Sequence, residues 1–137
     1  YNELLTYRTG NQWHDGKVRI VFVGNAPMRI LQQERVSFAA AQGTIADLEK
    51  NYDSKVMPFI GIDFQNDLSW NGVGKMPFDQ FMKFKEVITK AHEQGKKVRV
   101  YNCPNEENIW DVMVTSGVDL VNCSDPQAFS TFLKSKK

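Results

Sequence analysis

Short runs of β-branched and aromatic residues recur along the chain, and each run is followed by turn residues and then by a segment with helical periodicity. Several of these runs lack strict alternation of apolar and polar positions, which is typical of strands buried between helices in a parallel sheet. The five runs span residues 18–24, 36–40, 57–62, 98–102 and 118–123. The pattern therefore predicts an α/β fold with a parallel sheet and right-handed βαβ crossovers.

The segments between the runs carry independent helix signals. Gly95 and Gly117 stand where C-terminal caps belong, Asn105 is placed to cap a helix start, and Asp125 followed by Pro126 is typical of an N-cap and a first helical turn. The positions that mark the helical faces are Phe78, Phe81, Met82, Lys85, Ile88 and Ala91, then Ile109, Trp110 and Met113, and finally Phe129, Phe132 and Leu133. We therefore expect three helices in the second half of the chain.

The longest interruption of this alternation spans residues 63–75, directly after the third predicted strand. Such a loop leaves the carboxyl end of a strand, which is the functional edge of a β/α fold. Trp70 within it is a candidate exposed aromatic, acting as a lid or contacting a lipid headgroup. Packing of Trp70 over the rim of the fold is the more common role for a loop tryptophan.

Composition narrows the class of protein. With 137 residues, 42% apolar and 24% charged, the chain is expected to be one globular domain over residues 1–137, or part of one. A net charge of +1 indicates no excess of positive charge for binding nucleic acid, so nucleic acid is not expected as a partner. No apolar run approaches the roughly 18 residues of a transmembrane segment, and no signal peptide is visible. A chain that starts at Tyr1 is expected to be processed or partial.

Two cysteines, Cys103 and Cys123, do not form a disulfide framework or a metal-ligand spacing. They end adjacent predicted strands, so their Cα atoms are expected near the range of roughly 4.4–6.8 Å that a disulfide needs. Free thiols remain the expected state.

Four segments carry a resemblance to a known family. They are KVRIVFVGNAP at 17–27, MPFIGIDF at 57–64, LSWNGVGKMP at 68–77 and AHEQGKKVRVYNCPNEENIWDVMVTSGVDLVNCSDPQAF at 91–129. In this order they resemble the C-terminal half of the phospholipase C-like phosphodiesterases, the family of glycerophosphodiester phosphodiesterases and phosphatidylinositol-specific phospholipase C, in the branch of altered inheritance of mitochondria protein 6.

The resemblance implies a (β/α) barrel of TIM type, here incomplete, because a complete barrel needs roughly 200 residues or more. The five predicted strands would be the fourth to the eighth. In the family, two catalytic histidines and the ligands of a divalent metal, usually calcium or magnesium, lie on the first strands, so no metal ligand is expected here. His14, expected in a loop, and His92, expected near a helix end, match no catalytic position. Relatives also make secretion or a periplasmic location an expectation.

The chain departs from the family at two predicted strand ends. Residues 42–44 read Gln-Gly-Thr where relatives tend to carry Asp-Gly-Arg, and residues 61–62 read Gly-Ile where Ser-Asp is expected, although Asp63 follows. The changes remove charged groups from the functional edge. They weaken the inference of the family's substrate specificity.

The candidate substrate-binding residues lie at or near predicted strand ends, and each has a structural alternative. They are Asn25, Asp63, Arg99, Tyr101 and Asn122. Asn25 would bond a hydroxyl or form a turn; Asp63 would bind a metal or polyol, or act as a cap. Arg99 would bind a negatively charged group or form an interior ion pair. Tyr101 would pack against a sugar or inositol ring. Asn122 would contact the ligand or hold a neighbouring loop in place.

The first functional hypothesis is therefore the C-terminal portion of a phosphoric diester hydrolase, with a small phosphodiester or polyol as ligand and the catalytic groups outside this chain. A non-catalytic barrel fragment that binds a ligand or partner is the rival. An independent open domain of flavodoxin-like type is the third reading. Because a partial barrel leaves strand edges unpaired, we expect it to need a missing N-terminal half or to self-associate.

Overall fold

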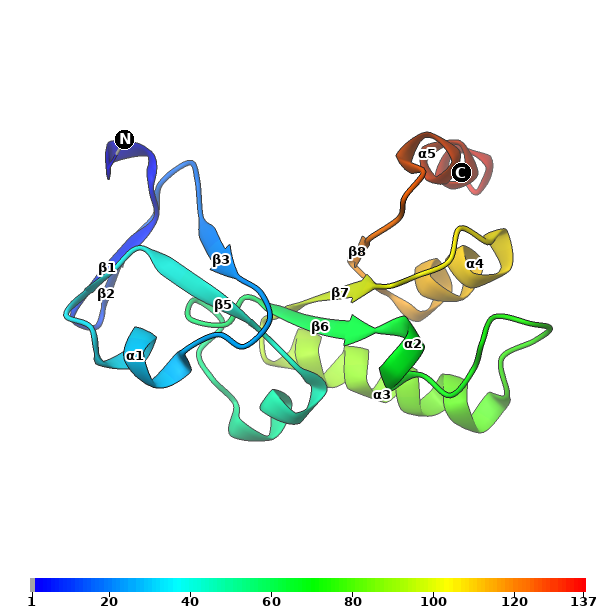
Figure 1. Cartoon of the computed structure of the whole chain (residues 1–137), viewed down its shortest axis with the longest axis horizontal. Helices are drawn as coiled ribbons and strands as arrows, with labels where there is room; N and C mark the ends of the chain where they lie inside the picture. The colour runs from blue at the N-terminus through cyan, green and yellow to red at the C-terminus, as the bar shows by residue number, and fades with distance from the viewer. Residues whose placement is uncertain (1) are drawn as a thin grey trace.

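The computed structural model describes residues 2–137 and contains two β-sheets (Figure 1). All five strands of the larger sheet are parallel and follow the order β3-β5-β6-β7-β8, while the smaller sheet is antiparallel with the order β2-β1-β4. The strands are β1 (Tyr7–Thr9), β2 (Gln12–His14), β3 (Ile20–Phe22), β4 (Val36–Ser37), β5 (Ala39–Gly43), β6 (Phe59–Asp63), β7 (Lys97–Tyr101) and β8 (Leu120–Val121). The helices are η1 (Asn2–Leu4), α1 (Met28–Gln33), η2 (Ile45–Lys50), α2 (Phe64–Asp67), α3 (Phe78–Glu93), α4 (Glu107–Ser116) and α5 (Pro126–Ser135).

The parallel sheet predicted from the hydrophobic pattern is confirmed, because each of the five runs overlaps one of its strands. Neighbours in the sheet follow one another along the chain without a reversal of order. Each successive strand is therefore added at the same edge of the sheet. In a doubly wound sheet, by contrast, the strand order reverses at a switch point. The sheet of the described residues does not close on itself into a barrel.

One face of this sheet packs against helices. Ile60 and Ile62 of β6 and Val98 and Val100 of β7 have no exposed surface and form one core with Phe84, Ile88 and Ala91 of α3 and Ile109 and Met113 of α4. Alternation along each strand sends the intervening residues to the other face. Figure 1 shows α1 and α3 on the same side of the sheet.

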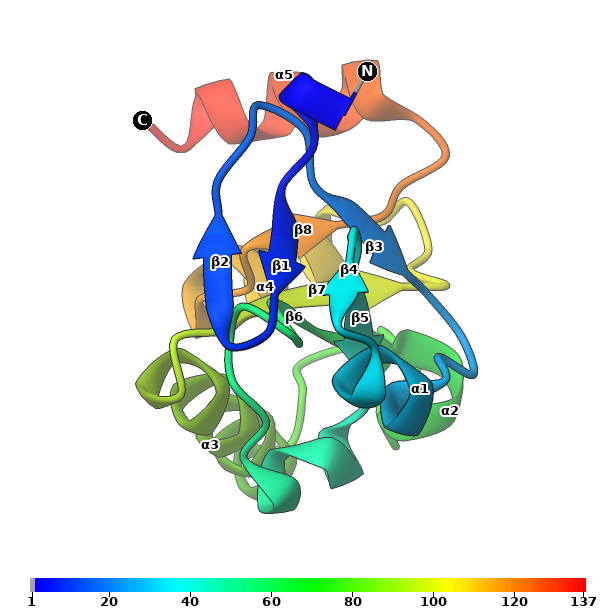
Figure 2. The same ribbon diagram turned by 90° about the vertical axis from the view of Figure 1, so that its left-hand side faces the viewer.

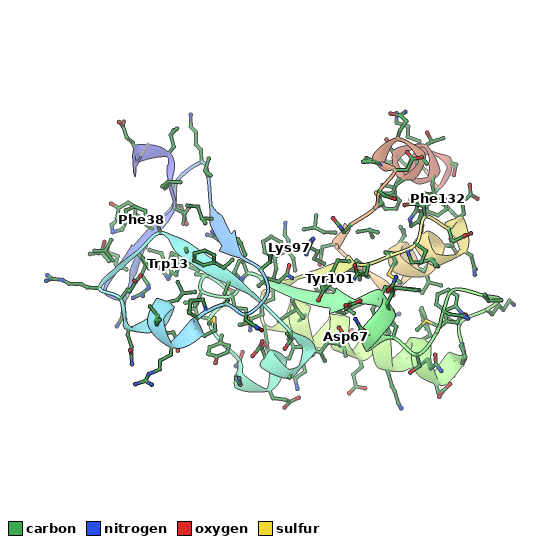
Figure 3. All side chains as sticks on the ribbon, viewed as in Figure 1. Trp13, Phe38, Asp67, Lys97, Tyr101 and Phe132 are labelled. Carbon is green, nitrogen blue, oxygen red and sulfur yellow. The ribbon has the colours of Figure 1, made fainter. Side chains whose placement is uncertain are left out.

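The opposite face is only partly covered. We call this surface the open face and define it by Phe59, Gly61, Lys97, Arg99, Tyr101 and Leu120. Phe59, Arg99 and Tyr101 are half-buried there, and Leu120 is 44% exposed. Figure 3 shows the labelled Lys97 and Tyr101 side chains above the central strands, on the side away from α3.

The prediction for the second run, 36–40, is wrong in one respect. Val36 and Ser37 form β4, which pairs antiparallel with β1, and only the residues from Ala39 onward join the parallel sheet. The cause is a hairpin that the hydrophobic pattern did not predict: β1 and β2 meet across a two-residue turn of Gly10, with φ of 61°, and Asn11. His14, expected in a loop, therefore lies in β2 (Figure 2).

Three predicted helix ends are confirmed. Gly95, just after the C-cap of α3, and Gly117, the C-cap of α4, adopt φ of 73° and 95°, a left-handed conformation that favours glycine. The Asp125 side chain accepts a hydrogen bond from the Ala128 N–H at 3.0 Å, and Pro126 occupies the first turn of α5. These ends are local features, which explains why the sequence identifies them.

Two other helix predictions are wrong. The N-cap of α4 is Glu106, because the Asn105 side chain is directed instead toward the Ser124 hydroxyl beyond β8. In α5, Phe132 is buried against Trp110 with ring centroids 5.6 Å apart, but Leu133 is 36% exposed and does not dock the helix. Phe132 and Leu133 are both apolar and adjacent in sequence, so the apolar pattern alone does not indicate which of them is buried.

The interruption at 63–75 is more ordered than a long loop. It begins with α2, and Trp70 is buried with 5% of its surface exposed, packed edge-on against Phe64 at a centroid distance of 6.2 Å. The Trp70 Nε1–H donates to the Val73 carbonyl at 3.1 Å. Trp70 is therefore packed into the fold, which is the alternative that the sequence favoured, and it is not an exposed lid.

None of the helices within residues 2–137 has both the length and the apolar character that crossing a bilayer requires.

Candidate functional site

Three of the five predicted site residues converge where β6 and β7 end. The two strands pair in parallel with Gly61 opposite Arg99 and Asp63 opposite Tyr101. Register partners in a parallel sheet point to the same side, so Asp63, Arg99 and Tyr101 all belong to the side that α3 does not cover. We call this end of the strands the carboxyl edge.

Arg99 is held in place by a neighbour on β5. Its Nη1 donates to the Gln42 Oε1 at 3.3 Å, and its guanidinium carbon lies 5.4 Å from the centroid of the Tyr101 ring. Among residues 2–137, Arg99 forms no ion pair, so the expected alternative of an interior ion pair is not found in the described part of the chain. The guanidinium keeps further N–H donors that are available to an anion.

Gln42 of β5 and Gly61 of β6 fit each other across neighbouring strands. A Cβ atom on Gly61 would lie 2.2 Å from the Gln42 Nε2. The absence of a side chain at position 61 therefore leaves the space in which the Gln42 amide lies and reaches Arg99. Gln42 is thus a neutral hydrogen-bonding group beside the guanidinium.

Asp63 is the N-cap of α2, the structural role that was the alternative to ligand binding. Its carboxylate accepts hydrogen bonds from the Gln65 N–H at 3.0 Å, the Asn66 side chain at 2.6 Å and the Asn102 side chain at 3.0 Å. The Asn66 side chain is the main cause of a pKa of Asp63 below its ordinary value. Asp63 therefore stays ionised at neutral pH.

Tyr101 lies beside this carboxylate. Burial raises the pKa of its phenol above the ordinary value, and the negative charges of Asp63 and Asp67 act in the same direction, whereas Arg99 acts against them. The phenol is therefore protonated at neutral pH and can donate a hydrogen bond. Its ring presents an apolar face next to a guanidinium, an arrangement suited to a ring-bearing polar ligand.

Asn25 and Asn122 lie outside this cluster of hydrogen bonds. Asn25 is exposed in the loop after β3, where the Ala26 N–H bonds to the Gly24 carbonyl at 2.8 Å, which agrees with the turn alternative. Asn122 is exposed directly after β8, and its backbone N–H bonds to the Val100 carbonyl at 2.8 Å. Neither side chain makes a hydrogen bond to another described residue.

The histidines are remote from the carboxyl edge. His14 stacks on Tyr7 at a centroid distance of 4.5 Å in the antiparallel sheet. His92, near the end of α3 as predicted, has its Nε2 2.7 Å from the Asp119 carboxylate, which also accepts the Val98 N–H at 2.8 Å. Asp119 precedes β8, so this pair lies at the amino ends of the strands.

A divalent metal does not fit the residues of this edge. Asp63 and Asp67 are its two carboxylates, and both already accept hydrogen bonds, Asp67 from the Asp63 N–H at 2.7 Å. Within residues 2–137, no three His, Cys, Asp or Glu side chains come together as ligands. Calcium and magnesium need a larger set of oxygen ligands, so we derive no metal-dependent step from this chain.

Both thiols are free, as expected. Cys103 is buried just beyond β7, and burial raises its pKa to about 11. A thiol with this pKa is almost entirely protonated at neutral pH and is a poor nucleophile.

Comparison of the chain with protein-family models, with curated proteins and with solved structures finds no match.

Three residues of the site were not predicted as ligand-binding. Gln42 was noted only as a departure from the family, and Asp67 and Asn102 were not singled out. Asn102 follows β7 and adopts a φ of 53°, a left-handed conformation that asparagine tolerates better than most residues. An asparagine as the last residue of a predicted parallel strand, 98–102, is the sequence signal that could have identified it.

Proposed function

We propose that this chain is the ligand-binding wall of a phosphoric diester hydrolase of the (β/α)-barrel type, with the catalytic histidines and metal ligands supplied by another part of the enzyme. The ligand is a small phosphodiester with a glycerol or inositol headgroup. The observation that carries the proposal is the convergence of Arg99, Tyr101 and Asp63 at the carboxyl edge of a parallel sheet. Ligands of β/α folds bind at this edge.

The strand order supports the barrel part of the proposal. Five parallel strands in unbroken sequence order, with helices packed against one face, are the arrangement that a section of a (β/α) barrel requires. A flavodoxin-like domain needs a reversal of strand order, and the described sheet has none.

Each site residue has a role in this proposal. The unused donors of Arg99 bind the non-bridging oxygens of the phosphodiester, where a planar guanidinium forms paired hydrogen bonds. The Tyr101 ring packs against the headgroup, and Asp63 with Asn102 hydrogen-bonds its hydroxyls. None of these side chains moves a proton of the reacting centre, so this wall orients the ligand.

A non-catalytic binding protein is the second candidate. The position of both histidines favours it, since His14 lies in the antiparallel sheet and His92 is paired with Asp119 at the amino ends of the strands. The binding site is the same in both candidates. Activity of the chain together with the rest of its enzyme would distinguish them.

Binding of three probes, measured by titration calorimetry, tests the proposal: the phosphodiesters glycerophosphoinositol and glycerophosphocholine, and uncharged myo-inositol. We expect the two phosphodiesters to bind more tightly than inositol, and Arg99→Gln to weaken phosphodiester binding by about tenfold, as for a lost charge-assisted hydrogen bond. Arg29→Gln, on the exposed surface of α1, is the matched control. Equal phosphodiester affinities for the wild type and Arg99→Gln would contradict the proposal.

A further inference from the structure

The Gln42 side chain runs across a neighbouring strand of the parallel sheet. Gln42 lies on β5 and pairs in register with Phe59 of β6, so both side chains point to the open face. From there the Gln42 Oε1 reaches the Arg99 Nη1 at 3.3 Å, although Arg99 lies on β7, beyond β6. Neighbouring strands are about 4.8 Å apart, so the amide has to pass directly over β6.

Gly61 of β6 leaves the space for this crossing. A Cβ atom at position 61 would lie 2.2 Å from the Gln42 Nε2 and 2.8 Å from its Cδ, so a side chain there would displace the amide. Glycine weakens the interior of a strand, and its presence often marks a site where another group approaches the backbone closely. The group that approaches Gly61 is the amide of Gln42.

The contact with Arg99 fixes the orientation of the amide. An arginine side chain has N–H donors and no acceptor, so the Gln42 carbonyl oxygen faces the guanidinium and the amide nitrogen points away from it. The Gln42 Nε2 has no hydrogen-bond partner among residues 2–137, and it is not one of the buried unpaired atoms of that part of the chain. This nitrogen therefore reaches solvent and is a donor that a ligand can use.

Gln42 also leaves the charge of Arg99 uncompensated. Arg99 forms no ion pair within residues 2–137, and its Nη1 is bonded to a neutral amide. A glutamate at position 42 would have the same reach, and its carboxylate would form a charge-neutralising pair with the guanidinium. The neutral amide instead holds the guanidinium in place and leaves its charge to an anion.

We propose that Gln42 is a further ligand-binding residue of this site and that it also positions Arg99. Its Oε1 holds the guanidinium, and its Nε2 donates a hydrogen bond to a non-bridging oxygen of the phosphodiester that Arg99 binds. The anion site thus combines a guanidinium from β7 with a carboxamide from β5, which meet above Gly61. The inference rests on the proposed function, because it names a second donor for the same phosphate group.

Titration calorimetry of the whole 137-residue chain with glycerophosphoinositol tests the inference. Gln42→Met keeps the length of the side chain but loses both hydrogen bonds, and we expect about fivefold weaker binding. Gln42→Glu should weaken binding more than about tenfold, because its carboxylate would neutralise Arg99 and repel the phosphate. Gly61→Ala should weaken binding about fivefold, because the added methyl group displaces the Gln42 amide.

The double variant Gly61→Ala/Gln42→Met separates this role from a general structural effect. If the alanine acts only by displacing the Gln42 amide, it removes nothing further once residue 42 is methionine. The double variant should then also bind about fivefold more weakly than the wild type, whereas independent effects would multiply to about 25-fold. A loss of about 25-fold would contradict the inference, because two coupled residues do not give independent losses.

Gln33→Glu, on the exposed surface of α1, is the charge control and should bind like the wild type. Circular dichroism shows that each variant is folded before it is titrated. If Arg99→Gln weakens binding but Gln42→Met and Gln42→Glu bind like the wild type, the inference is overturned and the proposed function stands. A wild type that does not bind glycerophosphoinositol would overturn both.

Discussion

At the scale of single residues, the buried charge of this protein is concentrated outside the proposed site. Lys96, directly before β7, is only 1% exposed, and its Nζ donates to the Gln94 Oε1 at 2.6 Å. Burial lowers the pKa of Lys96, while the more distant charges of Asp53 and Asp47 act in the opposite direction. A lysine in this position costs folding free energy while it is charged.

The first prediction concerns the pH dependence of stability. The folded chain releases the Lys96 proton at a lower pH than the unfolded chain, whose lysine has its ordinary value of 10.5. Between these two pKa values the unfolded state binds more protons, so Lys96 makes the free energy of unfolding rise with pH. Lys96→Met should remove this rise and stabilise the protein by about 1 kcal/mol at neutral pH.

Urea unfolding of both proteins near neutral pH and near pH ~10 measures the effect, since that interval approaches the ordinary lysine pKa. The gain in stability from Lys96→Met should shrink at the higher pH. Lys83→Met, at an exposed position of α3, should show no such change. A gain that is the same at both pH values would contradict the assignment.

At the scale of elements, two glycines of neighbouring strands make room for side chains from other segments. A Cβ atom on Gly43 of β5 would lie 2.2 Å from the Met57 Sδ, and one on Gly61 of β6 would lie 2.2 Å from the Gln42 Nε2. The two contacts differ in kind. Met57 is 1% exposed and enclosed in the core, whereas Gln42 is half-buried and can swing away from the strand.

The second prediction follows from this difference. Gly43→Ala should lower the free energy of unfolding by about 2 kcal/mol, because the core around Met57 must be repacked. Gly61→Ala should cost less than about 1 kcal/mol, because the flexible end of Gln42 moves aside. Chemical unfolding of the two variants compares them directly, and similar losses would show that Gln42 is as tightly held as Met57.

The sequence predicted elements well where their signals are local. Gly95, Gly117 and the Asp125 cap ended or began helices as expected, because a cap depends only on a few neighbouring residues. The hairpin of β1 and β2 was missed although Gly10 and Asn11 form a typical hairpin turn. Asn105 was assigned the wrong role because its partner, Ser124, is 19 residues away along the chain.

At the scale of the whole molecule, the parallel sheet brings polar groups from distant parts of the chain together at one edge. The carboxyl edge gathers a cation, an aromatic ring and hydrogen-bonding groups: Arg99, Tyr101, Asp63 and Asn102. In Figure 1 the N-terminal segment and α5 both rise above this sheet, at its two ends. Neither His14 nor His92 lies at this carboxyl edge.

The last prediction concerns catalysis by the chain alone. We expect no measurable hydrolysis of bis(p-nitrophenyl) phosphate by this polypeptide with calcium or magnesium, because acid–base cleavage needs a proton-transfer group at the reacting centre. Neither His14 nor His92 lies at the carboxyl edge. Release of p-nitrophenol, followed by absorbance, is the measurement. Metal-dependent turnover that Arg99→Gln abolishes would overturn the assignment of the chemistry to another part of the enzyme.

The sequence by itself determined the alternation of strands and helices, three helix ends and three of the residues that meet at the carboxyl edge. It did so because hydrophobic period, capping and strand ends are encoded over a few neighbouring residues. Only the tertiary structure decided which face of the sheet stays open, that Gln42 fills the space above Gly61 and reaches Arg99, and that Trp70 is buried. These features depend on the register of strands far apart in the sequence, and a shift of register by one residue would place each side chain on the other face.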